Sequence, residues 1–185
     1  RQWLGSFTVE RYKGLDGLLP MAGKNSPQIN GDSPGEMAAD YAAILWFNEN
    51  VSGQPVILEA AGESYTDFGR ISAFTGLPAV MGWETHQWLW RTSKTTPDAY
   101  GSVVWPRQQD VRTMYVTADQ AERLKLIEKY QVAYVIIGDL ERNKYSVRLE
   151  DDSRQSIVRE DLLLELGEIV FQQDNLMVIK LTFQG

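Results

Sequence analysis

The sequence predicts an α/β fold of three layers: a mostly parallel sheet, flanking helices and a C-terminal antiparallel hairpin. Two apolar runs, at 55–58 and 132–137, are typical of buried strands. Helical patterns precede and separate them, and strands that alternate with helices favour a parallel sheet between two helical layers. Near the C-terminus, two apolar runs flank the polar triplet at 173–175, which is typical of a hairpin.

The chain is predicted to hold one domain with an N-terminal arm. Its 185 residues and 21.0 kDa suit a single core. Gly and Pro interrupt residues 1–35 so often that we expect an irregular arm there, followed by one α/β domain over 36–185. The chain opens on Arg1 without an initiator Met, so we expect it to be a fragment of a longer protein.

The first half of the domain begins with a helix predicted over 36–50. Met37, Tyr41 and Ile44 fall near one face of that helix, and a strand is predicted next at 54–59. Short elements follow with weaker patterns. They are a helix at 66–74 with Asp67 near its N-terminus, a strand at 77–81, and a helical turn at 84–91.

The second half is predicted to begin with an open loop at 92–105 and a helix at 106–115, which starts at its Pro. A longer helix is predicted at 117–130, with Thr117 as its N-cap and Gln120 at the capping-box position. The remaining elements are predicted as a central parallel strand at 132–137, a loop at 138–145, a solvated charged segment at 147–159, a short helix at 162–166, and hairpin strands at 168–172 and 176–183.

Composition excludes several classes of function. The net charge of −7 and the pI near 4.8 argue against nucleic acid as a partner. Neutral sugars, or polar lipid-linked substrates held by local Arg residues, remain open. Without Cys there is no disulfide and no Cys-ligated metal site, and no cofactor is predicted. No apolar run approaches the roughly 20 residues that a membrane helix needs.

Residues 59–91 are the segment richest in candidate chemistry, and they follow a predicted buried strand. Loops beyond strand ends are where α/β domains keep their sites. Glu59, Glu63 and Asp67 could act as acids, bases or metal ligands. Alternatively, Glu63 and Asp67 serve as turn and cap residues, and Glu59 pairs with Arg70 or Arg91.

Two further residues in this segment have a chemical and a structural interpretation. His86 is the single histidine, so a multi-His metal site is excluded. Ser64 lies in a Gly-x-Ser pattern that lacks the second Gly of a nucleophile elbow. The alternative is that His86 hydrogen-bonds within a polar cluster and orients the loop.

The aromatic residues Tyr65, Trp83, Trp88 and Trp90 could form a platform for sugar rings. They could equally bury area at an interface, because Trp88 and Trp90 cannot both point inward from one helix. In the second loop, 138–145, no phosphate-binding pattern occurs, and Glu141 and Arg142 are interpreted as structural partners of the upstream loop.

Taken together, motifs spread over residues 15–145 resemble the extracytoplasmic C-terminal region of the YYY family of uncharacterised polytopic membrane proteins. Residues 146–185 match it only in general strand character. The motifs that carry the resemblance are Leu15-Asp-Gly-Leu18, Asp40-Tyr-Ala-Ala-Ile44, Trp46-Phe-Asn48, Gly53-Gln-Pro-Val-Ile-Leu-Glu-Ala60, Ser64-Tyr65, Arg70-Ile-Ser-Ala73, Thr75-Gly-Leu-Pro78, Gly82-Trp83, His86, Trp90-Arg91, Asp110-Val111, Tyr115, Tyr134-Val135, Gly138, Glu141-Arg142 and Tyr145.

The resemblance implies a soluble domain on the extracytoplasmic face of a cell membrane, attached to its own transmembrane domain. The layout of the family is similar to that of GT-C-type glycosyltransferases, which transfer sugar from a polyprenyl-phosphate donor. The implied role is to assist a glycosyltransferase-like enzyme by positioning a lipid-linked sugar or a glycan acceptor, and the isolated domain is expected to be inactive. The alternatives are a non-catalytic glycan-binding or docking module, and a hydrolase that uses Glu59 and Glu63.

No catalytic residue and no metal ligand are assigned. The candidates for substrate binding or an interface are the polar and aromatic residues of the two loops. They are Glu59, Ser64, Tyr65, Arg70, Trp83, His86, Trp90, Arg91, Glu141 and Arg142.

Overall fold

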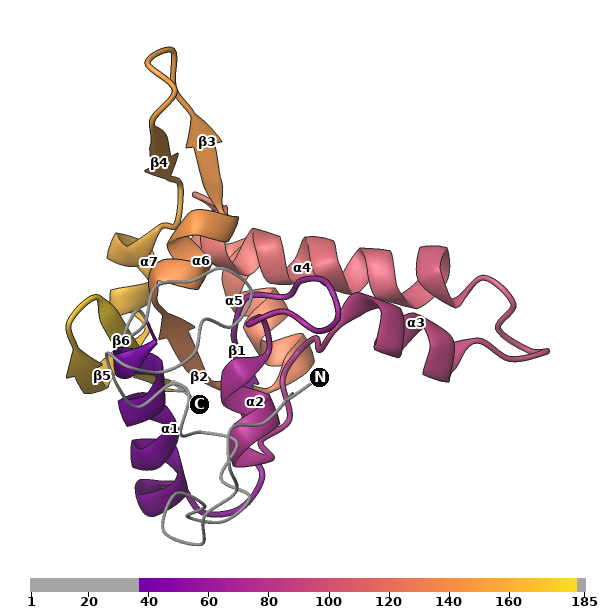
Figure 1. Ribbon diagram of the computed structural model, residues 1–185, viewed down its shortest axis with the longest axis horizontal. Coiled ribbons are helices and arrows are strands. Elements are labelled where there is room, and N and C mark those ends of the chain that lie inside the picture. Colours follow the sequence, from indigo (N-terminus) through magenta and orange to yellow (C-terminus); the bar gives the residue numbers. More distant parts are fainter. Residues whose placement is uncertain (1–36, 183–185) are drawn as a thin grey trace, which may run out of the picture.

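A computed structural model describes residues 37–182 (Figure 1). The predicted N-terminal arm, 1–35, lies outside these residues. The central sheet has four strands in the order β1 (Val56–Leu58), β2 (Val132–Ile137), β6 (Leu176–Leu181) and β5 (Gly167–Gln173). The mixed α/β class is therefore confirmed.

A mostly parallel sheet is not found. β1 and β2 pair in parallel, whereas β2–β6 and β6–β5 are antiparallel. The predicted C-terminal hairpin is confirmed as β5–β6, and it inserts its second strand beside β2. The strand predicted at 77–81 is reduced to a single parallel bridge between Ile57 and Ala79. Local sequence predicts that a strand is apolar, but not which neighbour it will pair with.

Helices cover both faces of the sheet, as the three-layer prediction requires. On one face, α1 (Ala38–Asn50) and α2 (Arg70–Thr75) contribute to an apolar cluster with Tyr134 and Ile136 of β2. On the other face, α4 (Trp105–Val116) and α5 (Gln120–Tyr130) pack against Val135 and Ile137. Alternate residues of a strand point to opposite faces, so β2 divides its side chains between two cores.

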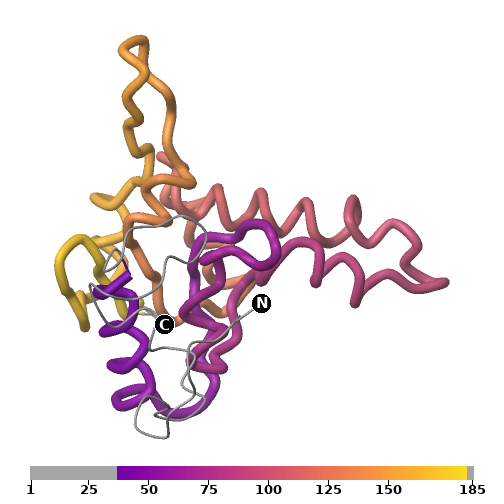
Figure 2. The backbone as a smooth tube through the Cα atoms, in the orientation of Figure 1, coloured from indigo at the N-terminus to yellow at the C-terminus, as the bar shows by residue number. Residues whose placement is uncertain are grey.

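A helical hairpin projects from this body (Figures 1 and 2). Its first arm is α3 (Glu84–Arg91), which matches the predicted helical turn. Its second arm is the π-helix η2 (Tyr100–Val104), which continues into α4, so only part of the predicted loop at 92–105 is a loop. We name residues 84–105 the projecting hairpin.

Helix α5 begins three residues later than the sequence predicts, and its cap is a different residue. The Asp119 carboxylate accepts hydrogen bonds from the backbone N–H groups of Ala121 and Glu122, at 2.9 and 3.2 Å. Thr117, the predicted cap, accepts instead from the N–H of Asp119, at 3.1 Å. The sequence offers two acceptable caps two residues apart, and the folded chain uses the second.

The segment at 138–145, predicted as a loop, contains helix α6 (Asp139–Lys144). The charged segment that follows forms a second projecting hairpin, β3 (Ser146–Arg148) and β4 (Arg154–Ser156), with residues 147–155 exposed (Figure 1). Helix α7 (Glu160–Leu164) begins two residues before its predicted start. Within residues 37–182, no helix is both long and apolar enough to cross a lipid bilayer.

Candidate functional site

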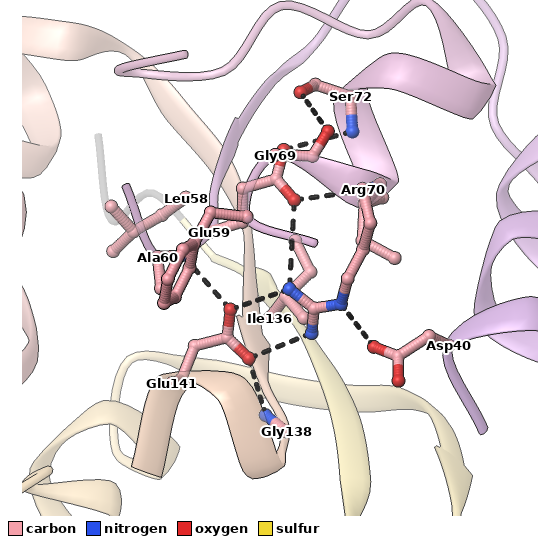
Figure 3. A network of polar contacts seen from close by, with 12 residues as sticks. Asp40, Leu58, Glu59, Ala60, Gly69, Arg70, Ser72, Ile136, Gly138 and Glu141 are labelled. Carbon is pink, nitrogen blue, oxygen red and sulfur yellow. Dashed lines mark hydrogen bonds and ion pairs between the residues drawn. The ribbon is translucent and has the colours of Figure 1, made fainter. Parts of the chain in front are cut away.

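The first of two polar arrangements is a buried ionic cluster of Asp40, Glu59, Arg70 and Glu141 (Figure 3). Arg70 is its centre: Nη1 and Nη2 each donate to a carboxylate oxygen of Glu141 at 3.0 Å, and Nε donates to Asp40. The paired bonds to Glu141 use the planar, forked geometry that makes Arg suited to carboxylates. The Arg70 side chain at the start of α2 thus lies between the carboxylates of Asp40 in α1 and Glu141 in α6.

Glu59 lies at the end of β1 and caps helix α2. Its two carboxylate oxygens accept from the backbone N–H groups of Ile71 and Ser72, both at 3.0 Å. Because the residue preceding α2 is Gly69, which has no side chain to cap the helix, the carboxylate of β1 takes that role. Glu59 is 1% exposed, and Nη1 of Arg70 lies 4.0 Å from its Oε2.

Glu141 joins the segments that follow β1 and β2. One carboxylate oxygen accepts from the N–H of Ala60 at 3.0 Å, and the other from the N–H of Gly138 at 2.9 Å. A Cβ at position 138 would lie 3.3 Å from both Arg70 Nη2 and Glu141 Oε2, so a glycine lets the backbone approach the pair. The two loops singled out in the sequence therefore meet, and Glu141 is a structural partner of the upstream loop as predicted.

The pKa values of the three carboxyl groups shift in different directions, because burial raises each pKa and the positive charge of Arg70 lowers it to a different extent. Burial raises the pKa of Asp40 and of Glu59, and the attraction of Arg70 offsets this only in part. Burial acts on Glu141 too. There, however, the Arg70 charge and hydrogen bonds from Arg70, Ala60 and Gly138 outweigh it, and the pKa of Glu141 is lowered. The charges of Glu141 and Asp40 raise the pKa of Arg70 despite its burial, so it stays a cation.

The buried ionic cluster is closed to substrates. Glu59, Arg70 and Glu141 are each buried, and their polar atoms are bonded to one another or to backbone. Glu63 is exposed, so Glu59 and Glu63 do not present two carboxylates to one open cleft. Among residues 37–182, no group of three or more His, Cys, Asp or Glu side chains is arranged to hold a metal ion.

The second arrangement is an exposed ring cluster of Tyr65, Trp83, His86 and Trp90. The His86 and Trp90 rings stack with centroids 5.2 Å apart at 22°, and Tyr65 meets His86 edge-on at 5.2 Å. His86 Nε2 and Tyr65 Oη lie 3.2 Å apart. Trp83 anchors the cluster, because its Nε1 donates to the backbone oxygen of Phe68. Four candidates from the sequence are thereby brought together.

The backbone of the ring cluster is strained at its edge. Tyr65 has φ of +62°, in the left-handed region that side chains other than Gly and Asn rarely adopt. Tyr65 is 75% exposed and Trp90 78%, so both residues are largely accessible to solvent. Beside them, the Ser64 hydroxyl is the single buried side-chain polar atom within residues 37–182 that lacks a hydrogen-bond partner. Strain of this kind concentrates at binding sites.

The remaining two candidates, Arg91 and Arg142, lie apart from the buried ionic cluster. Arg91 is exposed on α3, and its Nε donates to Gln87 Oε1 at 2.8 Å. Arg142 makes a paired contact with Glu160 of α7, at 2.7 and 3.0 Å, and donates to the backbone oxygen of Asn175. Arg142 therefore holds α7 and the β5–β6 turn, not the upstream loop as the sequence suggested.

Sequence reasoning missed two members of this region. Asp40 belongs to the buried ionic cluster, and its signal was a carboxylate three residues after Met37 on the apolar face of the first helix. Tyr115 is fully buried, and its hydroxyl lies within hydrogen-bonding distance of the backbone oxygens of Leu58 and Ile136, at 3.1 and 2.7 Å. It bridges the ends of β1 and β2, a role that no local pattern signals.

No family model matches this chain, and no curated protein matches it. Among solved structures, the chain is similar to the C-terminal globular domain of an oligosaccharyltransferase from Archaeoglobus fulgidus. The TM-score is 0.49 and the sequence identity 10%, over 82% of this chain and 99% of that chain. A similarity of this size establishes neither family nor function, so the resemblance to the YYY family stays a prediction.

Proposed function

We propose that this chain is a non-catalytic, extracytoplasmic domain of a multi-pass, glycosyltransferase-like membrane protein, and that its exposed ring cluster binds a sugar of the substrate. The observation that carries this proposal is the group of four rings, two of which, Tyr65 and Trp90, are largely exposed. Sugar rings present apolar C–H faces and polar edges. An exposed aromatic face takes the first, and His86 offers a hydrogen-bonding group to the second.

A rigid base favours binding by the ring cluster. Glu59 fixes the start of α2, and Arg70 fastens the same segment to α1 and α6. Trp83 and Tyr65 lie on either side of that fixed segment in the sequence, so their rings are held before a ligand arrives. A binding site that is already ordered loses less conformational entropy when it is filled.

The placement of the carboxylates favours binding over catalysis. A general acid or nucleophile must reach its substrate, and Glu59 is buried with both oxygens bonded to backbone N–H groups. The hydrolase alternative would need Glu59 and Glu63 to face each other across a cleft. We therefore place the chemistry of sugar transfer in the membrane part of the protein, and a positioning role in this domain.

A lipid-linked sugar would also bring phosphate. Arg70 is buried and its donors are bonded to carboxylates, whereas Arg91 is exposed and lies one residue after Trp90. In this proposal Arg91 is the cation nearest to the sugar-binding rings along the chain. The proposed partners of the domain are a lipid-linked donor or a glycan acceptor, together with the protein's own transmembrane domain.

Titration of the 185-residue chain with simple hexoses and N-acetylhexosamines tests the proposal, with tryptophan fluorescence and aromatic NMR shifts as readouts. We expect saturable binding that Trp90→Ala and Tyr65→Ala each weaken by about fivefold, since an aromatic contact contributes about 1 kcal/mol. Trp105→Ala is the matched control, because Trp105 is another half-exposed tryptophan outside the ring cluster. Absence of sugar binding, or equal loss in Trp105→Ala, would contradict the proposal.

A further inference from the structure

Helix α3 lacks the packing that usually supports a short helix. It has eight residues, none of them buried. Isolated helices of this length are marginal in water, and most helical stability in proteins comes from a buried apolar face. Yet α3 displays Trp88 at 42% exposure and Leu89 at 56%, in addition to Trp90 of the ring cluster. These apolar side chains of α3 are therefore accessible to a binding partner.

The apolar surface continues across the second arm. The Trp88 ring meets Tyr100 of η2 edge-on at 6.4 Å, and Tyr100 is itself exposed. Trp105, at the start of α4, is half exposed as well. The backbone of the projecting hairpin extends outward, away from the sheet (Figure 2). Trp and Tyr have an apolar body and a polar N–H or O–H, which suits them to the boundary between lipid and water.

The tip of the projecting hairpin, residues 85–97, differs in charge from the rest of the chain. Between Glu84 and Asp98 the sequence carries two cations, Arg91 and Lys94, and no carboxylate. The whole chain has a net charge of −7, so everything outside this stretch sums to −9. A strongly acidic protein is repelled by anionic lipid headgroups, and this tip is a segment that they would attract.

We propose that the tip of the projecting hairpin rests in the headgroup region of a lipid bilayer, with Trp88 and Leu89 inserted and Lys94 facing anionic lipid. The inference deepens the proposed function, since it rests on a domain that works beside a membrane. It also gives that domain an orientation, because the ring cluster, which runs along α3 to Trp90, is then held close to the bilayer, where the sugar of a lipid-linked substrate lies.

Vesicle binding tests this inference. The 185-residue chain is mixed with vesicles of phosphatidylcholine, alone or with phosphatidylglycerol, and bound protein is measured by flotation. We expect binding that is stronger on the anionic vesicles. The double variant Trp88→Ser/Leu89→Ser should reduce it by about tenfold or more on both kinds of vesicle, because it removes the inserted apolar area.

Two further variants separate the apolar and the electrostatic contributions. Lys94→Glu should weaken binding by at least about fivefold on anionic vesicles and leave neutral vesicles unaffected, since each surface cation contributes about 1 kcal/mol. Leu124→Ser is the matched control, as Leu124 is an exposed apolar residue on α5, and it should bind like the parent chain. Brominated lipid should quench the tryptophan fluorescence of the parent, a readout that remains if the double variant does not fold.

Several outcomes would overturn the inference: no binding of the parent to either vesicle, no quenching by brominated lipid, or a loss in Leu124→Ser as large as in the double variant. Tyr65→Ala keeps the two proposals distinguishable, because Tyr65 lies outside the projecting hairpin. It should weaken sugar binding and leave vesicle binding unchanged. A chain that binds vesicles but no sugar would refute the proposed function alone.

Discussion

At the scale of single residues, Arg70 explains why a strongly polar segment belongs to the core. It is almost completely buried, and it contacts carboxylates from three other parts of the chain. Buried charges cost desolvation energy unless they are paired and hydrogen-bonded, and each carboxylate here has such a partner. Glu59, which the sequence offered as a possible acid or base, thus belongs to the group of residues that fastens the sheet ends together.

The two glutamates of the buried ionic cluster should respond to pH in opposite directions. The pKa of Glu141 is lowered from 4.5 in the folded protein, so its contribution to stability is present above about pH 4.5 and is lost as the pH falls through the folded pKa. The pKa of Glu59 is raised from 4.5, so its contribution is present below about pH 4.5 and is lost as the pH rises through the folded pKa.

Neutral amides at these positions test the assignment. The destabilisation caused by Glu141→Gln should be largest near pH 7 and shrink below about pH 4.5. For Glu59→Gln, the unfolding free energy should instead rise relative to that of the parent chain as the pH rises. Urea unfolding between acidic and neutral pH measures both, and Glu63→Gln, at an exposed carboxylate, is the control. Parallel pH profiles for the two buried variants would contradict the proposed balance of charges.

At the scale of elements, the start of α5 shows how tertiary context chooses between local signals. Asp119 accepts two backbone N–H bonds at the N-terminus of the helix, while Thr117 bonds to the Asp119 N–H and to Glu122. The helix therefore depends directly on the carboxylate and only indirectly on the threonine.

Asp119→Ala should lower the unfolding free energy by about 1 kcal/mol, because it removes the cap of α5. Thr117→Ala should cost clearly less. Thermal or urea unfolding at neutral pH measures the difference between these matched alanine variants. If Thr117→Ala proved the more damaging of the two, the cap inferred from the sequence would have been the correct one.

Helix α6 was missed for a related reason. Its sequence, from Asp139 to Lys144, is almost entirely polar and has no apolar stripe at helical spacing. The helix is held instead by Glu141, whose carboxylate accepts from Ala60 and Gly138 and pairs with Arg70. A helix fastened by one buried carboxylate gives no periodic signal, because pattern-based prediction detects apolar faces.

At the scale of the whole molecule, stability and binding surface are separated in space. The two apolar clusters and the buried ionic cluster lie at the sheet, whereas two hairpins project from it (Figure 1). Residues 147–155 of the β3–β4 hairpin are exposed throughout, and the turn bonds of its tip are local, such as Leu149 N–H to Ser153 O at 2.9 Å. We infer that this hairpin contributes little to folding.

Replacing residues 148–154 by Asn-Gly should change the unfolding free energy by less than about 1 kcal/mol, because Asn-Gly forms a two-residue hairpin turn and no buried residue is removed. Ile179→Ala, at a fully buried position of β6, shows that the assay detects core damage, with an expected loss of about 2–5 kcal/mol. Failure of the shortened chain to fold would mean that the hairpin helps to build the core.

The sequence by itself determined the class of the fold, the strand at 132–137 and the hairpin near the C-terminus, because strand and helix periods are local properties that apolar residues reveal directly. It also indicated that residues 59–91 hold most of the candidate site residues, because polar and aromatic residues are dense there. Only the tertiary structure decided what those residues do. Whether Glu59 meets solvent or the N-terminus of α2, and whether β2 pairs with β6, depends on contacts between segments that lie far apart in the chain, and on the burial that those contacts create.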